Sequence, residues 1–454
     1  MRYDFQMQTV TEVFAGGANP QAAEPRPSEF HGLMRFWFRT MMGKFVGNDL
    51  DALHRLERAA FGFTDASAPF VLRLSDVPAA DRPDFAVPLP FGKAYLGFPF
   101  YEFDEFKEGD DVAWYRVNRS YIPAGKTFTL SLRFKVPDAM LQNVVLGSLW
   151  LLFNFGAIGS RTRRGFGVLK ALSAHQGDTP LFYFAPSPSM PIGDFYSRGR
   201  KLVEGWFGTF AGGAAGGGDA AGEDAEPENT EYGTFGAWEG RLVVRDDVKD
   251  ADRWFDDWGL FLRLFRNDEI AGTQPGDWQV PSGNYLHPRF SRGLLRQRTL
   301  DYRRVITHCI DGTDPVPDDL QDPSQPEHLK TYLRNDVLGL PIVVRSSRRR
   351  KSRTVAWRVP GESQDRRRAS PLFLRPVLLP DGRVACLCVF FIGHFLPDEA
   401  GMGLPYGEYD SLELDPPNHR DIRRAAERFT GEVKRLFAPR AGHPGDLLLT
   451  LPEP

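Results

Sequence analysis

Residues 150–170 read WLLFNFGAIGSRTRRGFGVLK, an apolar segment that runs into a loop of glycines and arginines and returns to an apolar run. Glycine has no Cβ, so it adopts positive φ and lets the backbone come close to another chain. The arginine guanidinium matches phosphate oxygens in a bidentate geometry that lysine does not offer. The pattern predicts a loop that holds a polyanion backbone, and the alternative is an exposed connection with solvated arginines. The candidate residues are Gly156, Gly159, Arg161, Arg163, Arg164, Gly165 and Gly167.

Two familiar phosphate-binding loops do not fit this stretch. The P-loop requires Gly-x-x-x-x-Gly-Lys followed by Ser or Thr, whereas Arg164 and Gly165 stand where the second half of that motif should be. The dinucleotide-binding Gly-x-Gly-x-x-Gly motif should follow a strand and open a helix, and neither its spacing nor its context is present.

Two further groups of cations are candidates for contact with a polyanion. Arg35 and Arg39 are four residues apart, so they share one face of a helix predicted over residues 30–44, and His31 stands near its start. The densest basic run, residues 345–353, contains Arg348, Arg349, Arg350 and Lys351. Such runs repel themselves until a polyanion neutralises them, but a solvated helix face and a solvated surface loop are the alternatives.

The composition indicates a folded globular protein without a disulfide framework. The chain has 454 residues, 42% of them hydrophobic, and a formal net charge of -3, so any nucleic-acid role must come from local clusters of charge. The three cysteines have no CxxC spacing, and Cys386 and Cys388 alternate in what is best interpreted as a buried strand. We expect no metal, no cofactor, no membrane segment and a cytoplasmic location.

The hydrophobic periodicity predicts an α+β fold. Strands are expected over residues 3–13, 70–74, 94–98, 127–135, 167–171, 240–245 and 384–392, and helices over 30–44, 49–60, 139–153, 252–265 and 421–437. The first half is compatible with a β-α-β-β-α-β unit that carries insertions. Residues 211–231 are glycine-rich and acidic, which predicts a flexible linker between domains at 1–210 and 232–454.

The string GAIGSRTRRGFG resembles the glycine-rich signature of the RAMP superfamily of CRISPR-associated RNA-binding proteins. The N-terminal strings FAGGA at 14–18 and RPSEFHGLMRFWFR at 26–39, with LGLPI at 338–342 and RASPL at 368–372, are similar to the first RAMP subunit of the type III-B (Cmr) effector complex. This resemblance implies tandem ferredoxin-like (RRM-like) domains with insertions.

The resemblance also implies a non-catalytic RNA-binding subunit of a type III CRISPR RNA-guided complex. Such a subunit holds guide RNA, in its 3′ part, and/or target RNA by backbone contacts, while base pairing supplies specificity. The expected partners are CRISPR guide RNA, target single-stranded RNA and other RAMP-family subunits.

Two catalytic alternatives remain open. The first is a metal-independent RAMP endoribonuclease that processes precursor guide RNA with His31 as general acid or base; the resembled subunit usually has a lysine at that place. The second, a metal nuclease, requires clustered carboxylates, whereas the side chains of adjacent pairs such as Asp110-Asp111, Asp246-Asp247 and Asp256-Asp257 diverge in regular structure.

Overall fold

The computed structural model describes most of the chain in several stretches. They are residues 1–17, 19, 22–105, 113–187, 189–214, 232–266, 342–345, 352–358, 370–393, 401–406, 409–414 and 419–451. The basic run with Arg348, Arg349, Arg350 and Lys351 lies outside the described residues, as do Cys309 and the Asp110-Asp111 pair. None of the described helices is long and apolar enough to cross a membrane.

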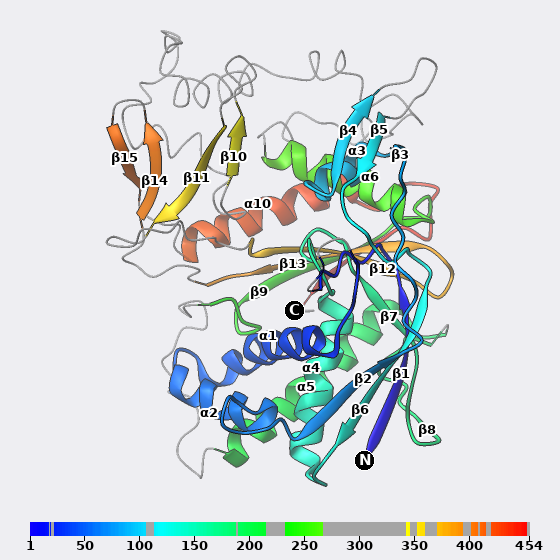
Figure 1. The fold of residues 1–454 in the computed structure, drawn as a ribbon, viewed down its shortest axis with the longest axis vertical. Helices are drawn as coiled ribbons and strands as arrows, with labels where there is room; N and C mark the ends of the chain where they lie inside the picture. Colours follow the sequence, from blue (N-terminus) through cyan, green and yellow to red (C-terminus); the bar gives the residue numbers. More distant parts are fainter. Residues whose placement is uncertain are drawn as a thin grey trace.

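The first half of the chain forms a ferredoxin-like domain (Figure 1). Its elements follow one another as β1 (Arg2–Thr9), α1 (Pro27–Val46), α2 (Leu50–Phe61), β2 (Phe70–Ser75), β6 (Thr127–Phe134), α4 (Ala139–Phe155), β7 (Leu169–Gln176) and β8 (Thr179–Pro180). The antiparallel sheet has the order β2-β6-β1-β7-β8. This is the β-α-β-β-α-β topology predicted from the sequence, with α1 and α4 as its two helices.

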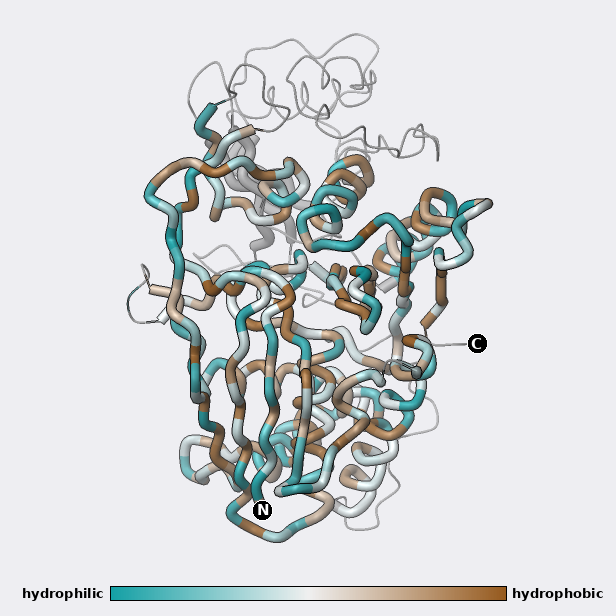
Figure 2. Tube along the Cα trace, turned by 90° about the vertical axis from the view of Figure 1, so that its right-hand side faces the viewer, coloured by the Kyte–Doolittle hydropathy of each residue, from teal (hydrophilic) through white to brown (hydrophobic). Residues whose placement is uncertain are grey.

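Period-two alternation decides which face of this sheet is buried. Tyr3, Phe5 and Met7 of β1 lie in the core with α1 and α4, whereas the residues between them are exposed or half-buried. The strands appear in Figure 2 as parallel runs of alternating polar and apolar tube. The outer face of the sheet is therefore polar, and the core lies on the helical side.

An insertion between β2 and β6 forms a small separate layer. It contains β3 (Val87–Leu89), α3 (Phe91–Leu96), β4 (Tyr101–Glu105) and β5 (Ala113–Val117), with the sheet order β3-β5-β4. The strand predicted over residues 94–98 is wrong, because Pro90 precedes a short helix that Gly97 ends. An apolar run this short does not distinguish a strand from a helix by its periodicity.

The second half repeats the same topology. Its elements are β9 (Trp238–Val244), α6 (Ala251–Arg266), β12 (Leu372–Leu378), β13 (Val384–Phe391), α10 (His419–Phe437) and β16 (Leu447–Leu451), and the antiparallel sheet has the order β12-β13-β9-β16. The tandem ferredoxin-like architecture is thus confirmed. A further sheet, β10-β11-β14-β15, is formed by Ile342–Arg345, Ser352–Arg358, Gly401–Tyr406 and Tyr409–Leu414.

The two ferredoxin-like units share one hydrophobic seam. All eight residues of β13 are buried. Leu387 and Phe391 pack in one core with Trp37 of α1, while Cys386 and Cys388, on the opposite face, pack in a core with Trp254 of α6. The expectation that the two cysteines occupy a buried strand is confirmed. The second sheet is therefore covered on both faces, by its own helices and by those of the first domain (Figure 1).

One long helix was not expected from the sequence. Helix α5 (Ile192–Ala214) packs against α4 and runs past residue 210, the predicted end of the first domain. Its glycines permit this close packing, because a Cβ at Gly199 would collide with the ring of Trp150. The exact domain boundaries remain a prediction.

Candidate nucleic-acid interface

The glycine-arginine loop, residues 156–167, connects the end of α4 to β7 and lies on the seam between the domains. It folds back on itself, since the Ile158 N–H donates to the Gly167 carbonyl at 2.9 Å. Gly167 has φ +72°, and a Cβ there would fall on the carbonyl of Ile158. A Cβ at Gly156 would collide with the indole nitrogen of Trp37. These glycines serve close packing within the protein.

Several backbone donors of this loop have partners inside the chain. The Gly159 N–H donates to Oε1 of Glu29, in the first turn of α1, at 2.6 Å, and the Gly167 N–H donates to the Glu12 carbonyl at 2.9 Å. Burial raises the pKa of Glu29, against the lowering effect of the bond from Gly159. The carboxylate of Glu29 thus takes the place at Gly159 that we expected an RNA phosphate to take.

Arg163 faces inward, toward the second domain. Its Nη1 donates to the Ser370 carbonyl at 2.8 Å, and its guanidinium lies 4.7 Å from the ring centre of Phe373 and 5.9 Å from that of Phe36. Burial lowers its pKa to about 10, so the side chain is still charged at neutral pH. Its backbone carbonyl accepts from the Leu374 N–H at 3.1 Å. The loop therefore pairs with the edge of β12 and protects it.

The neighbouring arginines of the loop take different positions. Arg164 forms a parallel β-bridge to Leu374 and is half-buried, whereas Arg161 is exposed and has φ +60°. A positive φ at a non-glycine residue indicates a tightly turned loop tip. Gly165, which follows at φ +87°, lies against Trp254.

The two arginines of α1 share one buried carboxylate. Glu57 of α2 is paired with Nε of Arg35 at 2.5 Å, and the nearest nitrogen of Arg39 is 3.8 Å from its other oxygen. The side chain of Arg39 is 45% exposed, against 27% for Arg35. Glu57 therefore holds Arg35 in place and leaves donors of Arg39 directed to solvent.

Arg39 and Arg163 meet at one hollow between the domains, which we call the seam hollow. Its volume is about 380 Å³, within the range of small-molecule sites. Its residues come from α1, α2, the glycine-arginine loop, the segment before β9, and strands β12 and β13. They are Phe36, Arg39, Thr40, Leu50, Leu53, Arg163, Tyr232, Gly233, Phe373 and Phe391.

The structure places His31 apart from the loop arginines. Its Nε2 lies 3.2 Å from the Phe61 carbonyl at the end of α2, and its ring packs against those of Phe61 and Phe70. Burial lowers the pKa of His31 and favours the neutral imidazole. The loop arginine Arg163 instead contacts residues of α1 and the second domain.

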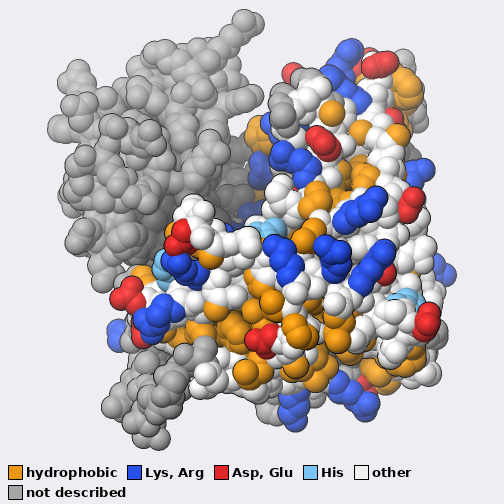
Figure 3. Space-filling model, turned by 60° about the horizontal axis from the view of Figure 1, so that its bottom comes forward, with side chains coloured by type: hydrophobic (Ala, Val, Ile, Leu, Met, Phe, Trp, Pro, Cys, Tyr) orange, Lys and Arg blue, Asp and Glu red, His pale blue; other side chains and the backbone are white. Residues whose placement is uncertain are grey.

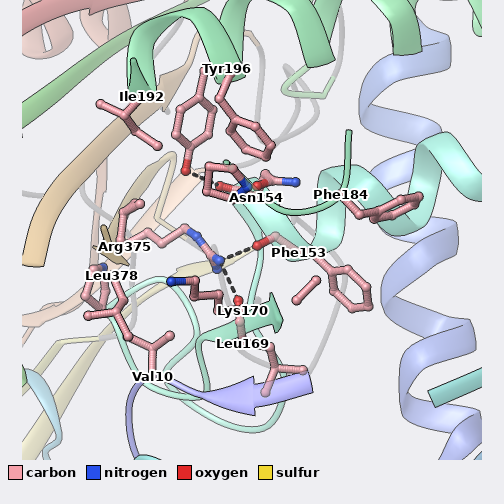
Figure 4. A pocket seen from close by; sticks show the side chains of 15 residues that line it. Val10, Phe153, Asn154, Leu169, Lys170, Phe184, Ile192, Tyr196, Arg375 and Leu378 are labelled. Carbon is pink, nitrogen blue, oxygen red and sulfur yellow. Dashed lines mark hydrogen bonds between the residues drawn. The ribbon is translucent and has the colours of Figure 1, made fainter. Parts of the chain in front are cut away.

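Arg375 is a buried residue of the seam that the sequence reasoning missed. Its guanidinium donates to the carbonyls of Phe153 and Gly156, at the C-terminal end of α4, and to the Leu169 carbonyl at 2.9 Å. Figure 4 shows the bonds to Phe153 and Leu169. Burial lowers its pKa to about 10. The last carbonyls of a helix lack partners within it, so a cation from β12 caps α4. The signal in the sequence is a lone arginine inside the apolar strand LFLRPVL.

One cluster outside the seam has side chains that bind metals in other proteins. Ligand atoms of Asp246, His443 and Asp446 all lie within 4.8 Å of one another. Both carboxylates already have cationic partners, because Arg383 donates to Asp246 at 2.8 Å and Arg440 to Asp446 at 2.8 Å. Arginine–carboxylate pairing thus accounts for this cluster, which joins the end of β9 to the turn before β16.

Sequence comparison relates the first part of the chain to known proteins. Residues 6–170 match the model of the RAMP superfamily. Two CRISPR system subunits from Pyrococcus furiosus are similar to it. Cmr subunit Cmr1-2 is 27% identical over 177 residues, which are 37% of this chain and 92% of that protein. Cmr subunit Cmr1-1 is 26% identical over 181 residues, or 38% of this chain and 48% of that protein.

Two solved structures align with nearly the whole chain. The crystal structure of Cmr1 from Pyrococcus furiosus in its apo form covers 99% of this chain and 98% of its own, with a TM-score of 0.48 at 14% identity. A chain of the type III-B Cmr-beta complex bound to cognate target RNA covers 95% and 99%, with a TM-score of 0.43 at 12% identity.

Proposed function

We propose that this chain is a non-catalytic RNA-binding subunit of a type III CRISPR RNA-guided effector complex. The RAMP-superfamily match over residues 6–170 and the two similar Cmr1 subunits support the assignment to such a complex. The RNA it holds is guide RNA, in its 3′ part, and/or target RNA, and its partners include other RAMP-family subunits. Its place of action is the cytoplasm.

The observation that carries RNA binding is the meeting of two separate cationic motifs at one site. Arg39 comes from α1 and Arg163 from the loop after α4, and both line the seam hollow, with Arg161 exposed in the same loop. Arginine side chains bind the phosphate oxygens of the RNA backbone, and these contacts do not depend on the RNA sequence. On the face shown in Figure 3, a row of Lys and Arg side chains runs beside apolar side chains.

The endoribonuclease alternative loses support from the position of His31. Cleavage at a phosphate needs a group that takes the 2′-hydroxyl proton and another that protonates the leaving oxygen. His31 points its Nε2 to a backbone carbonyl, and its described neighbours Arg35 and Glu57 are paired with each other. We therefore assign no catalytic role to this histidine.

The test measures RNA affinity of the full chain at several salt concentrations. Replacing Arg39 and Arg161 by Ala should weaken binding and reduce the slope of log K against log salt by about 1.4, since each phosphate contact on a single strand contributes about 0.7. Arg198→Ala, which changes an arginine of α5 that is 72% exposed, is the matched control. An unchanged affinity and slope in the double variant, with binding intact in the control, would refute the proposed site.

A further inference from the structure

The seam hollow combines the cations Arg39 and Arg163 with an aromatic surface, and contact with phosphates accounts for the cations alone. We propose that it receives a single unstacked nucleobase of the bound RNA, with the phosphates beside that base on Arg39 and Arg163. This inference rests on the proposed function and adds to it a place where the protein contacts a base.

Aromatic side chains form the wall on which a base can stack. The rings of Phe36 and Phe373 lie 6.3 Å apart with their planes at 30°, and Phe391 lies 5.6 Å from Phe373. Phe36 is only partly buried, so it presents ring surface to the hollow. Proteins bind single-stranded RNA by splaying bases out and stacking them on aromatic rings or guanidinium planes.

The charge of the hollow favours an anionic ligand. The described contacts of Arg163 are a backbone carbonyl and two aromatic rings, and none of them is a carboxylate. A guanidinium that is already out of water gains most from an anion, because the cost of removing its hydration has been met during folding. Arg39, 3.8 Å from a carboxylate that Arg35 also holds, supplies a second cation at the same hollow.

An apolar side chain from a protein partner fits these observations less well. It would fill the aromatic part of the hollow, but it would leave the charge of Arg163 buried without an anion. A nucleotide satisfies both parts, since its base is flat and its phosphate is negative. Leu50 and Leu53 of α2 add an apolar wall against which one edge of the ring system can pack.

The experiment removes one base at a time from an RNA bound to the full chain. Abasic nucleotides are placed at successive positions of a single-stranded RNA, so that the phosphates and their charge are unchanged. We expect one position at which loss of the base weakens binding on the order of tenfold, in the range of a single base–aromatic stack. A 2-aminopurine at that position should change its fluorescence on binding.

Two variants link that position to the hollow. Leu50→Trp fills its mouth, because Leu50 lines the hollow and is 48% exposed, and Phe36→Leu removes the stacking ring. Both should abolish the dependence on position, whereas Leu172→Trp, at a site on β7 that is 40% exposed, should retain it. Circular dichroism confirms that each variant is folded.

The outcomes separate this inference from the proposed function. If every abasic RNA binds as tightly as the intact one, the hollow takes no base, although binding through phosphates stands. If the sensitive position persists in Leu50→Trp and Phe36→Leu, the base is bound elsewhere. The inference is also overturned if the Leu50→Trp variant binds the intact RNA and every abasic RNA as tightly as the wild-type chain does. That result would point to a protein side chain as the occupant of the hollow.

Discussion

Replacing Arg375 by Met tests whether a cation from the second domain caps a helix of the first. The guanidinium donates to the carbonyls of Phe153, Gly156 and Leu169. Methionine is similar in length and apolar, so it preserves much of the packing and removes every donor. The three carbonyls then remain in the seam without a cationic partner, and those of Phe153 and Gly156 lie at the negative end of the α4 dipole.

The magnitude follows from two opposing effects. Each hydrogen bond to a charged group contributes about 1.5–3 kcal/mol, and the three together contribute roughly 5–9 kcal/mol. Methionine avoids the desolvation of a buried guanidinium, which costs several kcal/mol per ion. The remainder is a destabilisation of about 3 kcal/mol, which is a large part of the 5–15 kcal/mol that stabilises a typical domain.

Equilibrium unfolding in urea, followed by far-ultraviolet circular dichroism and by tryptophan fluorescence, measures this loss. Arg375→Met should unfold at a clearly lower urea midpoint than the wild-type chain. Arg375→Lys should lie between them, because a compact ammonium cannot bridge three carbonyls in the way that a planar guanidinium does. Arg133→Met is the matched control, since Arg133 is on the exposed face of β6 and its loss should change stability by no more than about 0.5 kcal/mol.

An unchanged midpoint in Arg375→Met would refute this reasoning. It would mean that the carbonyls at the end of α4 find other donors once the guanidinium is gone, or that the cost of burying the charge equals the whole benefit of its bonds. A similar fall in Arg133→Met would show that the loss of any arginine destabilises the chain, and the capping role would have no support.

Three further predictions concern residues of the first domain. Gly167→Ala should lower the melting temperature by several degrees, because Gly167 has a φ of +72° and the new Cβ would collide with the Ile158 carbonyl. The control Gly125→Ala should lower it less, since Gly125 also has positive φ but no atom lies near its Cβ position. Burial lowers the pKa of His31, so the folded chain binds fewer protons than the unfolded chain. The stability of the chain should therefore fall as the pH drops below about 6.5. Urea midpoints at pH 7.5 and 5.5 should show this fall in the wild-type chain and not in His31→Gln. The purified chain should leave repeat-containing and guide-paired RNAs intact on denaturing gels, with or without divalent metal, and cleavage abolished by His31→Ala would restore the endoribonuclease alternative.

Much of the fold could be predicted from the sequence, because strong periodicity marks its main elements. The strand at Thr127–Phe134 and the helix at Ala139–Phe155 lie close to the predicted ranges. Helix α5 was missed because glycine disfavours helices by about 1 kcal/mol per residue relative to alanine. One of its glycines, Gly199, packs directly against Trp150 of α4, and that contact cannot be seen in a local sequence window.

The candidate site shows a similar division. The sequence identified the glycine-arginine loop, but the orientation of Arg163 depends on Ser370 and Phe373, about 200 residues further along the chain. Arg375 was missed for the same reason, because the helix that it caps is also about 200 residues away in the sequence. Local composition indicates which residues can bind an anion, whereas tertiary packing decides which of them remain exposed to do so. The RNA contacts themselves, including those at Arg161 and Arg39, remain predictions.

The shared seam also has a consequence for synthesis of the protein on the ribosome. The first sheet can form once β7 has been made, at Gln176, but the part of α1 that carries Phe36 and Trp37 is fully covered only when β12 and β13 follow, the latter at Val384–Phe391. At about 5–20 residues per second, roughly 10–40 s separate these two events. Throughout that interval the nascent chain exposes Phe36 and Trp37, so its yield in the cell depends on a chaperone or on rapid translation between the two halves.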